Sequence, residues 1–206
     1  SMPPAQFTQL VHALPLLNPA AVSQTLGSLS QLSAKAPKLM MSLTQTLSKL
    51  NDVAKSLKTL SSVFSKLDPS ILSKFTKLLS QLNVKDLVSV MKSLTKLMTK
   101  IDLKTLSTVL KSLTALKPKD LVKALKNLAT FTDKIGDKAL TKTLLQSLTT
   151  LPPKQLASSI QHLATISKAL DSGILQSVLR SLSSLSPKQL ASALQHLATV
   201  STHINS

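Results

Sequence analysis

The sequence predicts an all-α protein: a right-handed solenoid of about six αα-hairpin repeats, each close to 34 residues long, with twelve helices in all. Two observations predict this fold. Similar segments recur at a constant offset along the chain, and their apolar residues have the spacing of one helix face rather than of a strand. A two-helix unit of this length cannot bury its apolar stripe alone, so we expect neighbouring units to stack.

Each repeat contains a longer and a shorter segment. The longer one is clearest in LPPKQLASSIQHLATISKAL at 151–170 and LSPKQLASALQHLATVSTHI at 185–204, which are offset by 34 residues. Shorter segments lie between the longer ones, as in DKALTKTLLQSLTTL at 137–151. The register predicts one helical-repeat domain over 1–206, divided into repeats 3–36, 37–67, 68–101, 102–135, 136–170 and 171–206.

Capping residues mark the expected helix starts. Asn18-Pro19 and Ser186-Pro187 place a capping side chain before a proline, and Ser186 with Gln189 has capping-box spacing. The shorter helices are expected to begin at aspartates: Asp68, Asp102, Asp137 and Asp171. Because these carboxylates cap free N–H groups at helix N-termini, we expect the lysines to lack acidic partners.

The charge of the chain is strongly positive. Lysine and arginine total 25 against 8 acids, all aspartate, for a net charge of +17. Of the 24 lysines, 21 fall between Lys35 and Lys142. This basic belt in the middle of the chain favours a polyanionic partner.

Lysines also recur in the repeat register. We number the longer segments from their first residues, 17, 48, 82, 116, 151 and 185, as position zero. Positions +5, +9, +12 and usually +16 form the expected core, and +4, +7, +11, +14 and +18 lie opposite. Position +18 holds Lys35, Lys66, Lys100 and Lys134 in four successive units. Polar candidates at +7 and +11 are Lys55, Lys123, Thr59, Ser93, Asn127, His162 and His196.

If the longer helices stack side by side, the lysines at +18 form a row of ammonium groups suited to a phosphate backbone. The polar side chains beside this row would then contact the bases and determine sequence preference. The other interpretation is that these are ordinary solvated lysines that keep a leucine-rich protein soluble. With no Trp, no Tyr and four Phe, little is available to stack on bases. Contacts with RNA are therefore expected to be electrostatic and hydrogen-bonded.

The segments SPKQLASALQHLATV, PPKQLASSIQHLATI and KPKDLVKALKNLATF resemble the helical repeats of octotricopeptide and related RAP-associated proteins. These belong to the wider class of tetratricopeptide- and pentatricopeptide-type arrays. The resemblance is good over 116–135, 151–170 and 185–204, fair over 48–101 and poor before residue 36. It implies RNA binding. The unit here is shorter than that of the family, and Lys126, Gln161 and Gln195 stand where its repeats often carry an aromatic residue.

Catalytic motifs are not found in the sequence. It has no cysteine, no glycine-rich phosphate loop, no nucleophile elbow and no paired carboxylates in a polar cluster. Four histidines without Cys or Glu would have to converge to hold a metal ion. We therefore expect no enzyme activity, no cofactor and no metal.

Three classes of partner remain open: RNA or another polyanion, which is favoured, an acidic protein or peptide held by a scaffold, and an anionic lipid surface. Without a signal peptide or a long apolar span, an intracellular location, in the cytoplasm or an organelle, is expected. Ser1-Met2 resembles an expression scar or a start residue, so the sequence leaves open whether the natural protein extends beyond this chain.

Overall fold

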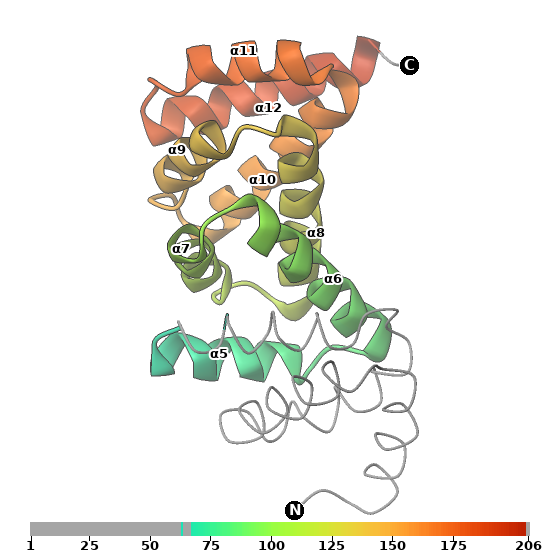
Figure 1. Cartoon of the computed structure of the whole chain (residues 1–206), viewed down its shortest axis with the longest axis vertical. Helices are drawn as coiled ribbons and strands as arrows, with labels where there is room; N and C mark the ends of the chain where they lie inside the picture. The colour runs from blue at the N-terminus through green and yellow to red at the C-terminus, as the bar shows by residue number, and fades with distance from the viewer. Residues whose placement is uncertain (1–62, 64–66, 205–206) are drawn as a thin grey trace, which may run out of the picture. The chain divides into compact units, whose positions relative to one another are not determined.

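The computed structural model describes residue 63 and residues 67–204. This part of the chain is all-helical, with no strand, which confirms the predicted class for these residues. Its helices are α5 (Pro69–Leu79), α6 (Val84–Lys100), α7 (Leu103–Leu113), α8 (Pro118–Ile135), α9 (Lys138–Leu148), α10 (Pro153–Ala169), α11 (Ser172–Leu182) and α12 (Pro187–Ile204) (Figure 1). The expected helices before residue 63, with the cap at Asn18-Pro19, lie outside the described residues.

Short and long helices alternate along the chain. α5, α7, α9 and α11 have 11 residues each, whereas the four helices between and after them have 17 or 18. Each short helix follows directly on an aspartate, as predicted. Asp102 accepts a hydrogen bond from the N–H of Thr105 at 2.8 Å, and Asp137 accepts one from Leu140 at 2.9 Å. Asp68 and Asp171 hold the same position without a side-chain capping bond.

Prolines and side-chain caps start the long helices. Proline is the first residue of α8, α10 and α12, where its missing N–H costs no helical hydrogen bond. Before α12, the Gln189 Oε1 atom accepts from the Ser186 N–H at 3.2 Å and from its hydroxyl at 2.7 Å. This is one half of the predicted capping box. α8 ends at Ile135 and is followed by Gly136, whose φ of 67° lies in the left-handed region that glycine adopts without strain.

The chain divides into two compact units, residues 1–95 and 96–206. In the first unit, the described part holds α5 and most of α6. Phe75 and Leu79 of α5 are fully buried, as are Val90 and Leu94 of α6. These residues are spaced by four, which is the helical period of an amphipathic face.

The second unit shows how successive sequence repeats pack. The long helix α10 lies between α8 and α12 and contacts both (Figure 1). The short helices contact each other in the same order, α7 with α9 and α9 with α11. Long helices therefore pack against long ones and short helices contact short ones, while α10 also contacts α7, α11 contacts α8 and α12 contacts α9. The side-by-side packing predicted for the long helices is confirmed within this unit.

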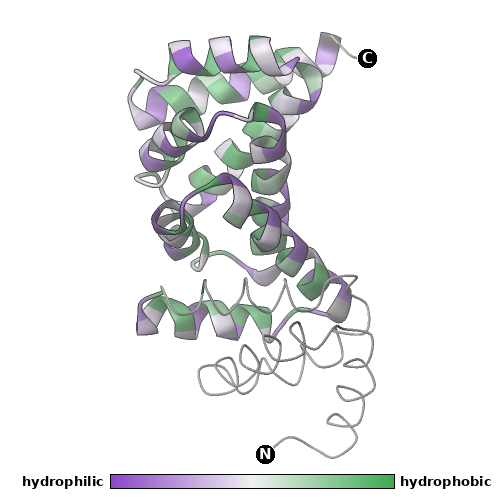
Figure 2. Ribbon diagram, viewed as in Figure 1, coloured by the Kyte–Doolittle hydropathy of each residue, from purple (hydrophilic) through white to green (hydrophobic). Residues whose placement is uncertain are grey.

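The core of the second unit follows the predicted register. At positions +5, +9 and +12, Leu121, Leu125 and Leu128 of α8 are fully buried, and so are the equivalent residues of α10, Leu156, Ile160 and Leu163. Figure 2 shows hydrophobic and hydrophilic residues alternating around these helices, the pattern of amphipathic helices. The predicted core positions are thus confirmed for α8 and α10.

Ion pairs join neighbouring repeats. Lys96 pairs with Asp133 at 2.7 Å, Lys142 with Asp102 at 3.8 Å and Arg180 with Asp137 at 2.9 Å. The expectation that the lysines lack acidic partners is therefore wrong for Lys96 and Lys142. The reason is geometric: stacking brings a basic side chain of one helix beside an aspartate of the adjacent repeat. Because the pairs are largely exposed, each is expected to contribute no more than about 1 kcal/mol.

Candidate nucleic-acid interface

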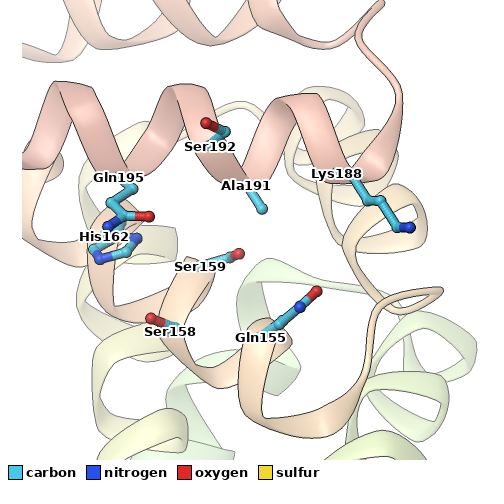
Figure 3. Close-up of a pocket in the computed structure, with 8 residues that line it drawn as sticks. All are labelled: Gln155, Ser158, Ser159, His162, Lys188, Ala191, Ser192 and Gln195. Carbon is cyan, nitrogen blue, oxygen red and sulfur yellow. The ribbon is translucent and has the colours of Figure 1, made fainter.

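Two grooves lie between consecutive long helices of the second unit. The groove between α10 and α12 has a volume of about 320 Å³. Its lining residues, shown in Figure 3, are Gln155, Ser158, Ser159 and His162 of α10 with Lys188, Ala191, Ser192 and Gln195 of α12. The groove between α8 and α10 has a volume of about 260 Å³. It is lined by Leu116, Asp120, Lys123, Ala124, Asn127, Lys154, Ala157, Ser158 and Gln161.

The two grooves are built from equivalent positions of the repeat. Each is lined by positions +4, +7, +8 and +11 of the preceding long helix and by +3, +6, +7 and +10 of the following one. Each set of positions shares one helix face at about 100° per residue. The same surface therefore recurs when the helix packing recurs.

Small residues explain why the space stays open. Position +6 is alanine in both grooves, Ala157 and Ala191, and position +8 is Ala124 or Ser159. Packed helices approach to about 8–10 Å, and larger side chains at these positions would fill the space between them. The alanines instead leave a hollow whose rim is polar.

Each groove combines an ammonium group with an amide. Position +3 supplies Lys154 to one groove and Lys188 to the other, and position +10 supplies Gln161 and Gln195. Neither lysine forms an ion pair with an acid of residues 63 or 67–204. These groups can bind an anion and can also donate hydrogen bonds to it.

The location of these two lysines is unfavourable for helix stability. Lys154 directly follows Pro153 at the start of α10, and Lys188 directly follows Pro187 at the start of α12. A positive charge in the first turn opposes the helix dipole, whereas a negative charge there would be stabilised. Helix formation therefore does not account for the lysines, whereas a bound anion would be stabilised both by them and by the helix N-termini.

His162 adds an unusual polar group to the α10–α12 groove. Its Nδ1 atom is buried and has no hydrogen-bond partner among the described residues. Burial lowers the pKa of His162, because the charged imidazolium is poorly solvated there. The side chain of Gln195 lies beside it in Figure 3. An unpaired buried nitrogen costs free energy, so packing alone does not explain a histidine at this position.

The carboxylate content of the grooves differs. Asp120 at position +4 lines the α8–α10 groove together with Lys123. Gln155 takes the equivalent position in the α10–α12 groove, and Ser158 stands where the other groove has Lys123. The two grooves thus share their position +3 and +10 groups but present different side chains at +4, +7, +8 and +11 of the preceding helix.

The structure brings together only some of the predicted site residues. Lys123 and Asn127 line one groove, and His162 lines the other. His196 and Lys134 are exposed and Lys100 is partly exposed, and none of them is among the lining residues of these two grooves. The remaining predicted residues before Ser93, namely Lys35, Lys55, Thr59 and Lys66, lie outside the described residues.

Ser93 is buried, with only 6% of its surface exposed, so the expectation that it lies on an open face is wrong. The equivalent residues Asn127 and His162 are longer and remain partly exposed. A serine side chain is too short to extend beyond its packed neighbours at this position.

Sequence reasoning missed Lys154 and Lys188 at position +3 and the glutamines at +10. A signal was present, since position +3 holds lysine in four successive units: Lys85, Lys119, Lys154 and Lys188. All four are exposed. The positions in Sequence analysis were assigned on a single helix, whereas about half of the residues that line each groove belong to the next long helix.

Among residues 63 and 67–204, no three His, Cys, Asp or Glu side chains are close enough together to hold a metal ion. No helix in this part of the chain combines the length and hydropathy needed to cross a bilayer. Comparison of the chain with protein-family models, curated proteins and solved structures found no match.

Proposed function

We propose that this chain is a non-catalytic helical-repeat protein that binds RNA or another single-stranded nucleic acid through the face formed by α8, α10 and α12. The observation that carries the proposal is that one groove recurs in equivalent register. In both grooves position +3 is a lysine without an ion pair among the described residues, and position +10 is a glutamine. Residues 96–206 contain 15 lysines and arginines against 5 aspartates. The surface is therefore suited to a polyanion.

We also propose that the whole sequence forms a right-handed solenoid of six such units and twelve helices. The stacking of α8, α10 and α12, with α7, α9 and α11 beside them, supports this extension. The sequence repeats with the same register on the N-terminal side of these helices. Equivalent grooves would then recur along the array, which suits a long ligand better than a small one.

In this proposal, lysine supplies affinity and the other groove residues supply selectivity. An ammonium is a point charge that attracts any phosphate, so Lys154 and Lys188 would hold the backbone irrespective of sequence. Asn127, His162 and the glutamines can donate to or accept from base edges. Stacking on Phe, Tyr or Trp has no part in these two grooves, because none of these residues lines them and Phe75 and Phe131 are fully buried.

The test compares two double variants of the full chain. Lys154→Gln with Lys188→Gln removes two groove charges, and Lys111→Gln with Lys138→Gln removes two exposed charges from the short helices α7 and α9. Binding of a labelled single-stranded RNA pool is followed by fluorescence anisotropy over a series of salt concentrations. The groove variant is expected to weaken binding and to lower the slope of log affinity against log salt by about 0.7 for each lost phosphate contact.

The control variant should retain the parental slope. Equal losses in both variants would show that net charge, rather than the grooves, determines binding, and would contradict the proposed interface. The same measurement with polyglutamate and with anionic lipid vesicles distinguishes the other partners. A polypeptide or a vesicle that binds more tightly than RNA, and that loses affinity with the groove variant, would replace nucleic acid as the partner.

A further inference from the structure

A single carboxylate lines the two grooves between the long helices, and it lies in the α8–α10 groove. It belongs to Asp120, an exposed residue at position +4 in the first turn of α8. Its side chain has no hydrogen bond or ion pair with any described residue, that is, residue 63 or residues 67–204. A carboxylate opposes the binding of phosphate by the neighbouring lysines, so attraction of a polyanion does not explain it.

Capping of the helix does not explain the carboxylate either. At the equivalent position of α6, Asp86 accepts a hydrogen bond from the Asn83 Nδ2 atom at 3.0 Å. In α12, Gln189 accepts one from the Ser186 hydroxyl at 2.7 Å. The partner in both cases is the residue at position +1, directly before the helix. In α8 this residue is Lys117, and α8 has no side-chain capping bond.

A negative charge at position +4 is also not required for a long helix to begin. α10 begins in the same way as α8, with a proline at its first residue, and its residue at position +4 is the neutral Gln155. The helix dipole favours an acid in the first turn, but only weakly at an exposed position. The carboxylate of Asp120 is therefore available to a ligand.

Basic and amide groups surround this carboxylate in the groove. Lys123 follows Asp120 by three residues, roughly 4.5 Å along the helix axis, and lines the same groove. The two side chains do not form an ion pair with each other. Asn127 lies further along α8, and α10 contributes Lys154 and Gln161. The groove thus places hydrogen-bond donors directly beside an acceptor.

Guanine is the RNA base whose edge matches this arrangement. Its N1–H and its 2-amino group are adjacent donors, which the two oxygens of one carboxylate can accept together, and its O6 atom beside them accepts a hydrogen bond. Adenine and cytosine place a ring acceptor next to their amino group, and uracil has one N–H between two carbonyls, which would repel a carboxylate. The groove volume of about 260 Å³ corresponds to roughly nine water molecules at about 30 Å³ each, which is enough for one purine base.

We propose that the α8–α10 groove receives a guanine base of the bound strand, with Asp120 accepting from its N1–H and 2-amino group, Lys123 donating to its O6 atom and Lys154 holding a phosphate. This inference rests on the proposed function and adds a base preference to one groove. The α10–α12 groove should lack this preference, because its position +4 is Gln155 and its position +7 is Ser158.

The probe is a labelled uridine oligomer with one central guanosine. It is compared with the same oligomer carrying inosine or uridine at that position. Inosine keeps the O6 atom and the N1–H of guanosine and lacks the 2-amino group. Fluorescence anisotropy measures the affinity of the full chain for each oligomer. We expect the guanosine oligomer to bind about tenfold more tightly than the inosine oligomer, which is the effect of one hydrogen bond to a charged group.

Two variants of the full chain test the role of Asp120. Asp120→Ala should bind the guanosine and inosine oligomers equally, because the acceptor is removed. Its affinity for the uridine oligomer should be unchanged or slightly higher, because a negative charge is lost, and this binding also shows that the variant is folded. The control is Asp171→Ala, which removes an exposed carboxylate before α11 and should keep the tenfold difference. Loss of discrimination without loss of affinity separates a base contact from a general effect of charge.

Equal binding of the guanosine and inosine oligomers by the parent chain would overturn the inference. A difference that persists in Asp120→Ala would overturn it as well. Both results would leave the proposed function standing, which fails instead if the chain binds none of the oligomers. Guanosine monophosphate should compete far more weakly than the guanosine oligomer, because it lacks the neighbouring phosphates. Competition as strong as that of the oligomer would overturn the assignment to a base within a strand.

Discussion

Truncation of one leucine at two equivalent positions tests the stacking directly. Leu163 in α10 and Leu197 in α12 both occupy position +12 of the repeat, in nearly identical sequences. Leu163 is fully buried, whereas Leu197 is partly exposed because no described helix covers the outer side of α12. Changing each to alanine removes the same three carbon atoms, so the difference in free energy of unfolding reports the covering repeat.

The expected magnitude follows from burial. Three carbon atoms at about 0.8 kcal/mol each give about 2.4 kcal/mol of lost transfer free energy at a fully buried site. The cavity left at Leu163 adds to this, for a total of about 3–5 kcal/mol. At Leu197 part of the side chain already contacts water and no closed cavity forms, so we expect about 1–2 kcal/mol.

Urea unfolding followed by far-ultraviolet circular dichroism measures both changes. Since repeat arrays can unfold in parts, hydrogen exchange of α10 and α12 provides a local measurement alongside it. Leu128→Ala in α8 is the internal check, because it has the same register and the same complete burial as Leu163. Equal losses for Leu163→Ala and Leu197→Ala would refute the difference in covering that we infer.

Two further predictions concern ionisable groups. Asp102→Ala removes the cap on Thr105 and should destabilise the fold by about 0.5–2 kcal/mol, whereas Asp171→Ala, in the same register without a capping bond, should cost less in the same urea assay. Burial lowers the pKa of His162, so the unfolded chain binds more protons, and stability should decrease as the pH falls from the usual histidine range toward the pKa in the folded state. His162→Gln should flatten this decrease; an unchanged pH profile would contradict it.

The sequence was sufficient to predict the local features of the fold. Helical spacing of leucines and an aspartate before each short helix are short-range signals, and the structure places α7, α9 and α11 directly after Asp102, Asp137 and Asp171. Stacking of the long helices followed from the need to bury a continuous apolar stripe. These features depend on residues that are neighbours in sequence or equivalent in register.

Features formed between helices were harder to predict. The grooves combine +11 of one helix with +3 of the next, so Lys154 and Lys188 did not stand out on a single helical projection. The ion pair between Lys96 and Asp133 joins residues 37 positions apart. Such pairs depend on the lateral offset of packed helices, which periodicity does not determine.

The grooves themselves suggest how one scaffold could combine uniform attraction with selectivity. Lysine at +3 and glutamine at +10 recur in both grooves, so they cannot distinguish one groove's ligand from the other's. The residues that differ are at +4, +7, +8 and +11, and at +11 Asn127 in one groove is replaced by His162 in the next. An amide donates and accepts hydrogen bonds at fixed sites, whereas a neutral imidazole has one donor and one acceptor that can exchange. Burial lowers the pKa of His162 and so favours the neutral imidazole. The grooves therefore differ in hydrogen-bonding groups at +8 and +11 and in charge at +4 and +7.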